Sequence, residues 1–277
     1  MDDPTAGAFD IATGPGPLVA AAVHDGHAVH PATLRHVALP EPDRLREEDP
    51  FTARLTAVAP TRIVGRRSRF EVDLNRSRDR AVYRTPDDAW GLDVWGGPAP
   101  DEAVERGLAV YDAFYQAVEA VLAQKVEAHG SVVVYDLHSY NHRRDGADAA
   151  PADPGENPEV NVGTGSLDRD RWGALVDRFM DDLRAGGEAA GLGALDVREN
   201  VKFQGGHFSR WAHATFGGAA CVLAVEFKKT FMDEWTGEPD RAHLAGLQTA
   251  LASTVDGVLA ERAAVEGGAV ADGTAAR

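Results

Sequence analysis

Apolar residues recur along this chain in two patterns, short continuous runs and helical repeats, and the two patterns alternate. Short runs rich in apolar residues, one of them alternating with acidic residues, predict strands at 17–24, 61–65, 69–74, 131–136 and 219–227. Apolar residues spaced three and four positions apart, with capping residues at the ends, predict helices at 43–58, 101–127, 167–186 and 240–262. Strands that alternate with helices are typical of α/β proteins.

This order of elements predicts one domain in three layers, α/β/α, with a mixed and largely parallel sheet. We expect the domain to span residues 1–265 and the Ala- and Gly-rich residues 266–277 to form a flexible tail. Residues 140–166 are rich in Asn, Asp, Gly and Pro and predict a long loop over the sheet. No GxGxxG motif follows a strand, which argues against a dinucleotide site.

The composition of the chain limits the kinds of molecule that it is expected to bind. Charged residues make up 26% of the chain and hydrophobic residues 44%, which is typical of a folded protein rather than a disordered one. The formal net charge of −16 repels nucleic acid and anionic membranes, so we expect neither as a partner. An anionic substrate would therefore need local positive charge, and the oligomeric state is left open.

Three further observations favour a cytoplasmic protein. The single cysteine, Cys221, excludes an internal disulfide and lies in an apolar run, where it is expected to be buried. The start of the chain, Met1-Asp2-Asp3-Pro4, lacks the basic and apolar segments of a secretory signal. No apolar run reaches the roughly 20 residues that span a bilayer.

Two histidines follow apolar runs at places where parallel sheets carry their functional groups. His24 ends the first strand, and His138 ends the run Val132–Leu137, two residues after Asp136. One histidine at a strand end is most simply structural, but two of them favour a metal site, because neutral imidazole is a common zinc ligand. A hydrolytic zinc centre has three protein ligands and an open position, so a third ligand is needed.

Three residues are candidates for that third ligand. Glu48 and Asp49 lie in the acidic segment before Pro50, which could equally be a solvated charge run at a helix end. His27 lies three residues after His24 and is ranked below both acids. The pattern alone does not choose between Glu48 and Asp49.

Side chains suited to bind an anion follow the alternating segment 69–74. Asn75 and Arg76 could hold a substrate carboxylate, because a guanidinium offers several donors in a fixed fork. The alternative is that Arg76 is one more surface arginine in a segment crowded with them. Asp73 is placed to orient either Arg76 or a histidine.

A carboxylate in the C-terminal part of the chain and a glycine-rich turn are the remaining candidates for functional residues. Glu226 lies in the run 219–227, where burial would raise its pKa into the range useful to a general base; a salt bridge to a following lysine is the alternative. Gly206 and His207, with Arg210 nearby, could allow close approach of a substrate, or could be a simple turn.

These motifs, in this order, resemble the N-formylglutamate amidohydrolase family, which is similar to the zinc carboxypeptidases and aspartoacylase. The matching segments span about residues 18–240: Val23-His24-Asp25-Gly26, Glu48-Asp49-Pro50, Val72-Asp73-Leu74-Asn75-Arg76, Asp136-Leu137-His138-Ser139, Asn161-Val162-Gly163-Thr164, Gly205-Gly206-His207 and Val225-Glu226-Phe227. The resemblance implies a phosphorylase/hydrolase-like α/β fold with one zinc ion.

By the same resemblance, His24 and His138 are metal ligands, Asn75 and Arg76 clamp the substrate carboxylate, and Glu226 is the catalytic carboxylate. In the carboxypeptidase pattern a glutamate stands three residues after the first histidine, where this chain has His27, so Glu48 or Asp49 is expected instead.

The resulting hypothesis is hydrolysis of an N-formyl or short N-acyl amino acid, with N-formyl-L-glutamate first and Arg143 or Arg210 holding a second carboxylate. A carboxypeptidase-like or other acyl-amino-acid hydrolase and a non-catalytic binding protein are the alternatives.

Overall fold

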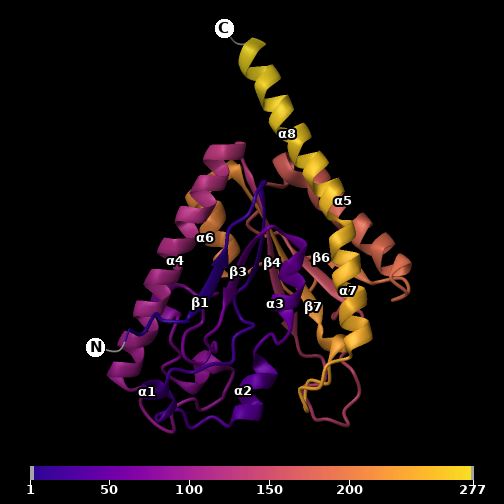
Figure 1. The fold of residues 1–277 in the computed structure, drawn as a ribbon. Coiled ribbons are helices and arrows are strands. Elements are labelled where there is room, and N and C mark those ends of the chain that lie inside the picture. The colour runs from indigo at the N-terminus through magenta and orange to yellow at the C-terminus, as the bar shows by residue number, and fades with distance from the viewer. Residues whose placement is uncertain (1–2, 276–277) are drawn as a thin grey trace.

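A single mixed sheet of seven strands runs through the molecule (Figure 1). The computed structural model describes residues 3–275, with side chains described as far as residue 268. The strand order is β1-β3-β2-β4-β7-β5-β6. Its strands are β1 (Phe9–Ala12), β2 (Leu18–Ala22), β3 (Thr61–Gly65), β4 (Val132–Tyr140), β5 (Val160–Gly163), β6 (Val197–Glu199) and β7 (Ala220–Lys228).

The four strands β3, β2, β4 and β7 are parallel and adjacent, so their carboxyl ends share one edge of the sheet. The strand β1 pairs antiparallel with β3, and β5 pairs antiparallel with β7 and parallel with β6. The expected mixed, largely parallel sheet is therefore confirmed.

Helices cover both faces of the sheet and complete the three layers (Figure 1). One face carries α4 (Asp101–His129) and α6 (His207–Phe216), and the other carries α3 (Thr52–Leu55), α5 (Arg169–Ala189), α7 (Arg241–Ser253) and α8 (Val255–Ala275). The short helices α1 (Pro31–Leu34) and α2 (Glu41–Glu47) lie at the carboxyl edge of the parallel strands. Short 3₁₀ turns cover Thr56–Val58, Arg78–Arg80, Pro86–Ala89, Gly217–Ala219 and Lys229–Phe231.

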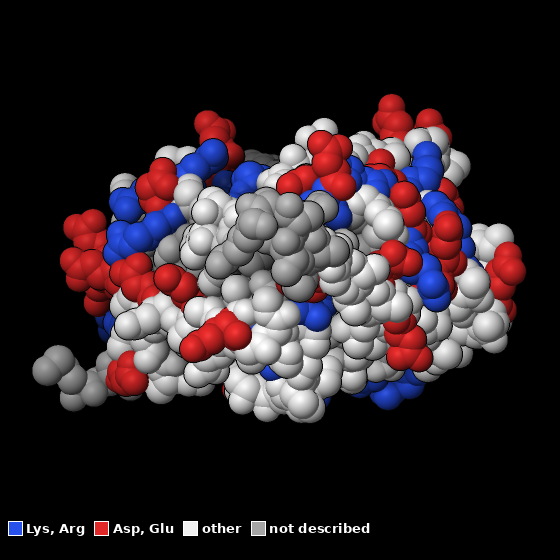
Figure 2. Space-filling model, turned by 90° about the horizontal axis from the view of Figure 1, so that it is seen from above, with Lys and Arg blue, Asp and Glu red and all other residues white. Residues whose placement is uncertain are grey.

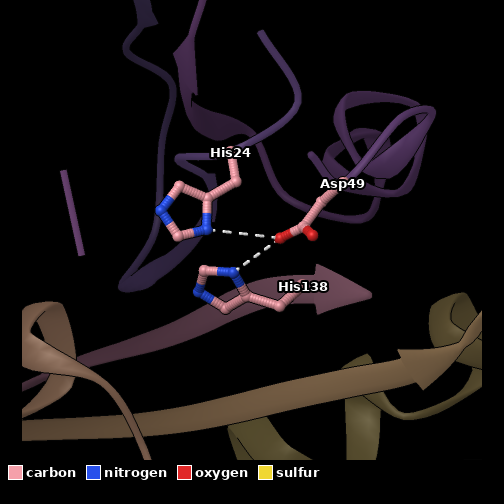
Figure 3. A group of neighbouring side chains, drawn as sticks. All are labelled: His24, Asp49 and His138. Carbon is pink, nitrogen blue, oxygen red and sulfur yellow. Dashed lines mark hydrogen bonds and ion pairs between the residues drawn. The ribbon is translucent and has the colours of Figure 1, made fainter. Parts of the chain in front are cut away.

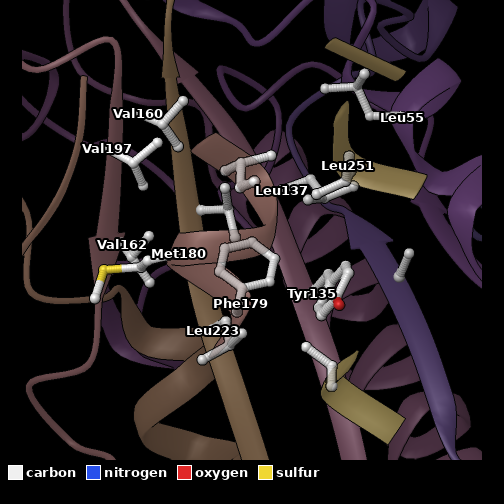
Figure 4. Packing of buried hydrophobic residues seen from close by; sticks show 14 of the residues in the cluster. Leu55, Tyr135, Leu137, Val160, Val162, Phe179, Met180, Val197, Leu223 and Leu251 are labelled. Atoms are coloured by element: carbon white, nitrogen blue, oxygen red, sulfur yellow. The ribbon is translucent and has the colours of Figure 1, made fainter. Parts of the chain in front are cut away.

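Burial on both faces explains why the central strands are continuously apolar. In β4, Val134 packs in the core beneath α4 and α6, whereas Tyr135 packs in the core beneath α5 and α7. In the second core the rings of Tyr135 and Phe179 meet edge to face at 5.0 Å (Figure 4). Cys221 of β7 is fully buried in the same core, as expected.

The expected strand at 69–74 is wrong. The segment begins with a turn in which the amides of Glu71 and Val72 donate to the carbonyl of Ser68, and it joins no ladder. Its alternating side chains are all buried nonetheless, because the segment is packed beneath 3₁₀ turns and α4. The alternating pattern of 69–74 predicted the burial of its apolar side chains correctly, but the segment does not pair with another strand.

The expected helix at 43–58 is interrupted. Glu48 is extended, with ψ at 175°, and Phe51 has a φ of 72°, so the chain leaves the helical conformation between α2 and α3. Pro50 lies in this break and disfavours a helical conformation at Asp49. The break places Glu48 and Asp49 in an extended segment that crosses the edge of the sheet.

Five short strands and helices in the described residues were not expected from the sequence: β1, α1, β5, β6 and α6. The strand β5 lies inside 140–166, which is therefore not one uninterrupted loop. The expected last helix is two helices, α7 and α8, which meet at Thr254, and α8 continues to Ala275. A flexible tail at 266–277 stays a prediction.

The end of the molecule from which α8 projects lies opposite α1 and α2 (Figure 1). Viewed from that end, acidic and basic side chains are interspersed around the rim (Figure 2). No helix in the described part of the chain combines the length and the apolar character needed to cross a membrane.

Candidate functional site

Three central strands deliver functional groups to the same edge of the sheet. His24 follows β2, His138 lies near the end of β4, and Glu226 lies near the end of β7. Because β2, β4 and β7 are parallel neighbours, their carboxyl ends converge. His138 and Glu226 are register partners in the β4–β7 ladder, so their side chains start side by side.

Asp49 reaches this edge on the extended segment between α2 and α3. Its backbone N–H donates to the carbonyl of His24 at 3.0 Å. The carbonyl of the preceding residue, Glu48, accepts a hydrogen bond from the ammonium of Lys229 at 2.7 Å. Lys229 is only 1% exposed. Burial lowers the pKa of Lys229 to about 8. The position of Asp49 is thus held by backbone contacts from two sides.

His24, Asp49 and His138 form a compact group of possible metal ligands (Figure 3). Asp49 Oδ2 lies 2.9 Å from His138 Nδ1 and 3.4 Å from His24 Nδ1. One ligand atom from each residue lies within 4.8 Å of the others, and all three residues are buried. Two imidazole nitrogens and a carboxylate oxygen are a donor set that suits zinc.

Each imidazole is held from behind by a second buried carboxylate. His24 Nε2 lies 2.7 Å from Asp73 Oδ1, and His138 Nε2 lies 3.0 Å from Asp136 Oδ1. Both carboxylates are fully buried. A carboxylate on the far nitrogen orients a metal-binding histidine and leaves Nδ1 free to bind the metal. This pairing on both rings supports a metal site.

The charges within the group reinforce one another. Burial alone would raise the pKa of Asp49, but the two histidines outweigh it and hold that pKa far below its usual value. Burial alone would lower the pKa of His138, but Asp136 and Asp49 raise it well above its usual value. The carboxylates around His138 thus create a strong preference for positive charge at this point.

The structure does not bring Glu48 or His27 into this group. The carboxylate of Glu48 accepts a hydrogen bond from Ser68 and lies 2.5 Å from His27 Nδ1. Successive side chains point to opposite sides of an extended segment, so Glu48 is turned away when Asp49 faces the two histidines. Of the candidate third ligands, the geometry selects Asp49.

A cavity of about 380 Å³ opens beside the two histidines. Its wall contains the three possible metal ligands and Glu226, and four cationic side chains also line it. These cations are Arg69, Arg144, Lys202 and Lys229. The local positive charge that an anionic substrate would need in a chain of net charge −16 is therefore present.

Glu226 is partly buried in the wall of this cavity. Burial raises its pKa to about 8, with His138 opposing the shift and Asp49 adding to it. The expected alternative, a salt bridge to a following lysine, is not what the structure has. Lys228 donates to the carbonyl of Asn157, and Lys229 donates to two backbone carbonyls and the side chain of Asn141.

Asn75 and Gly206 both line the cavity, and they pack closely against each other. Asn75 Oδ1 accepts from the N–H of Phe208 at 2.8 Å, in the first turn of α6, and Asn75 Nδ2 lies 3.2 Å from His138 Nε2. A Cβ on Gly206 would lie 2.2 Å from the amide of Asn75. The glycine at 206 is therefore required by close packing against Asn75.

Arg76, His207 and Arg210 lie outside the cavity wall. The guanidinium of Arg76 lies over the rings of Tyr83 and Trp90, at 4.8 and 5.6 Å. His207 Nε2 lies 3.0 Å from the hydroxyl of Tyr111, and Arg210 donates to the carbonyl of Gly205. A direct role of these three residues in substrate binding stays a prediction.

Arg69, unlike Arg76, lines the cavity. It donates to Asp73 Oδ2 at 2.9 Å and to the carbonyl of Glu47 at 3.2 Å, and it lies over the ring of Trp90. Arg69 could not be singled out among the neighbouring arginines from composition or periodicity, because only the fold turns it inward. Its spacing of four residues from Asp73 was the one available signal.

Replacing Asp136 by asparagine is expected to weaken binding of Zn²⁺ about 10- to 100-fold, because the carboxylate that orients His138 is lost. The chelator concentration that removes half of the metal measures this effect. Asp112→Asn is the control, because Asp112 is exposed on α4 and pairs with Arg78. Equal affinity in Asp136→Asn and the control would contradict an orienting role for Asp136.

Comparison with known proteins identifies a family that matches most of this chain. Residues 16–232 match the profile of a family described as N-formylglutamate amidohydrolase. No curated protein sequence matches the chain. The crystal structure of N-formylglutamate amidohydrolase from Ralstonia eutropha JMP134 is 21% identical with a TM-score of 0.69, and the match covers 92% of this chain and 98% of that one.

Two further solved structures are similar to lesser degrees. A gene product from Agrobacterium tumefaciens is 18% identical with a TM-score of 0.57, over 91% of this chain and 96% of that one. A metallo-carboxypeptidase from Burkholderia cenocepacia is 14% identical with a TM-score of 0.35, over 89% of this chain and 57% of that one, and is too distant to support an argument.

Proposed function

Because this chain belongs to the N-formylglutamate amidohydrolase family, we propose that it is a zinc-dependent hydrolase of N-formyl or short N-acyl amino acids. The proposed ligands of one zinc ion are His24, Asp49 and His138. N-formyl-L-glutamate is the first substrate to test, with formate and the free amino acid as products.

The observation that carries the proposal is the arrangement of the three ligands around a common point, with Glu226 in the wall of the same cavity. The donor set leaves a coordination position for water or a carbonyl oxygen, as catalytic zinc sites do. When bound, zinc would polarise the amide carbonyl and supply a water whose pKa is lowered from 15.7 to about 7.

Glu226 is proposed as the general base and then the general acid. Its carboxylate would accept the proton of the attacking water and later deliver that proton to the departing amine nitrogen. Burial raises its pKa to about 8, which improves its strength as a base and keeps it able to donate at the second step. A divalent cation nearby would lower this pKa.

Arg69 is the cavity residue best placed to meet the carboxylate of a substrate. Its side chain is held by Asp73 and Glu47 and lies over Trp90, so its remaining N–H groups are fixed in direction. Arg76 supports this arrangement from behind, because it stacks on Tyr83 and pairs with Asp73 at 3.6 Å. Asn75 would then act mainly by positioning α6 and His138.

A metal analysis of the purified protein combined with a formate-release assay tests this proposal. We expect about one zinc per chain and formate release that is lost on chelation and restored by Zn²⁺. Full turnover by metal-stripped protein would overturn the zinc mechanism. Preference for acetyl or peptide substrates would indicate a different acyl-amino-acid hydrolase, and bound metal without hydrolysis of any of them would indicate a binding protein.

A further inference from the structure

A second group of cations lines the cavity on segments that carry none of the proposed metal ligands. Lys202 lies on the turn after β6, and Arg144 lies on the loop after β4. Lys202 Nζ donates to the neutral amide oxygen of Asn157 at 2.5 Å and lies 5.3 Å from the ring of Tyr140. No described carboxylate forms an ion pair with it. Its charge is therefore free to meet an anion.

The turn that carries Lys202 is fixed to the sheet by one buried side chain. Asn161 Oδ1 accepts from the N–H groups of Lys202 and Phe203, at 2.8 and 3.3 Å, and its Nδ2 donates to the carbonyl of Phe203. Asn161 is fully buried and is the register partner of Glu226 across the β5–β7 ladder. The backbone of Lys202 is thus held at a fixed position relative to the strand that carries the proposed catalytic carboxylate.

The conformation of this turn is also unusual at its start. Asn200 has a φ of 54°, in the left-handed region, and exchanges side-chain hydrogen bonds with Thr164. Its N–H donates to the carbonyl of Val162 at 3.0 Å. These hydrogen bonds attach the turn to the end of β5, so they define the backbone conformation of the turn.

Arg144 is anchored in a comparable way. The two residues before it, His142 and Arg143, donate their backbone N–H groups to the carboxylate of Glu234 at 2.8 and 2.7 Å. The guanidinium of Arg144 lies 3.3 Å from Glu47, which is itself buried. Arg144 is about half exposed, at 56%, so it stands at the mouth of the cavity.

The two cations act on each other and on Glu226. Burial, and then the charge of Arg144, lowers the pKa of Lys202, while the charges of Glu156 and Glu226 oppose the shift. Two positive groups near one cavity wall repel each other, and an anion bound between them would offset this repulsion. The wall also contains the carboxylates of Glu47, Asp49 and Glu226, but four cationic side chains around one cavity are a local feature in a chain of net charge −16.

We propose that Lys202, assisted by Arg144, binds the distal carboxylate of a dicarboxylic N-acyl amino acid and selects it over the neutral amide. The proposal rests on the proposed hydrolytic function and adds the residue that would set the substrate preference of that function. The scissile amide would face Glu226 and the metal ligands, the α-carboxylate would face Arg69, and the side-chain carboxylate would face Lys202. Lys202 is thereby a specificity-determining residue.

The test compares N-formyl-L-glutamate with its neutral isostere, N-formyl-L-glutamine. The unmodified protein is expected to prefer the glutamate substrate in kcat/KM. Lys202→Met keeps the length of the side chain and removes its charge, so the preference should fall roughly 10- to 100-fold, toward a ratio of one. Arg144→Gln should lower it less, because Arg144 is more exposed and already paired with Glu47.

Lys228→Met is the matched control, because Lys228 also donates to Asn157, through the backbone carbonyl, but does not line the cavity. It should retain the preference of the unmodified protein. A preference that is absent from the unmodified protein, or unchanged in Lys202→Met, would overturn the inference while leaving hydrolysis intact.

Binding of the amino-acid products separates failure of this inference from failure of the proposed function. If no formyl substrate is hydrolysed, calorimetry of the zinc-loaded protein with L-glutamate and L-glutamine still reports the selectivity of the cavity. Tighter binding of glutamate that disappears in Lys202→Met supports the inference on its own. Equal binding of the two amino acids contradicts it.

Discussion

Replacing His138 by alanine is expected to remove the bound zinc and to reduce turnover to below about one-thousandth, because two ligands are too few for a stable hydrolytic centre. His138 provides one of the three converging ligand atoms, and its loss also leaves Asp136 buried without its hydrogen-bond partner. Metal content and formate release, measured on the same preparation, check the result.

His36→Ala is a suitable control for His138→Ala. His36 also contacts a carboxylate, Glu102 at 2.6 Å, but the pair is on the surface, where Glu102 opens α4. The control should retain zinc and activity. The unfolding transition of both variants separates loss of the site from loss of the fold. Normal turnover in folded His138→Ala would exclude the proposed metal centre.

Glu226→Gln is expected to lower kcat by about 10²- to 10⁴-fold while zinc remains bound, because the amide cannot accept the proton of water. Glutamine has nearly the same shape, and Glu226 is not one of the proposed ligands. The variant should therefore separate proton transfer from metal binding, which His138→Ala cannot do. Near-normal kcat in Glu226→Gln would remove this residue from the chemistry.

The pH dependence of kcat/KM is an independent test of Glu226 as the general base. A general base works only when ionised, so kcat/KM should rise as the pH increases through the pKa of Glu226. Burial places that pKa at about 8, and a bound divalent cation lowers it, so the rise should lie below pH 8. Glu119→Gln, on the exposed face of α4, should keep the profile, and Glu226→Gln should lose this limb.

The parts of the site carried on strand ends were predictable from sequence. His24, His138 and Glu226 each end an apolar run, and parallel strands bring their carboxyl ends together whatever the loops do. The choice of Asp49 over Glu48 was not predictable, because it depends on which side of an extended segment faces the histidines. That direction is set by contacts with His24 and Lys229, which are remote in sequence.

The anion-binding side chains were the least predictable part. Arg69 and Arg76 are equally cationic, and the expectation of a strand at 69–74 obscured the turn that sends Arg69 inward. Lys202 lies between β6, which has three residues, and α6, which has ten, and elements this short carry little periodic signal. Its position follows from the contacts of Asn161, which only the folded chain reveals.

Asp73 joins two functions that are usually considered separately. One of its oxygens lies against His24, and the other accepts from Arg69 and from Tyr83. A change at Arg69 would therefore alter the orientation of His24, a proposed metal ligand, and a change at His24 would alter the position of Arg69. Substitutions at these two positions should not be additive in free energy, so a redesign of substrate preference at Arg69 would have to re-optimise metal affinity at the same time.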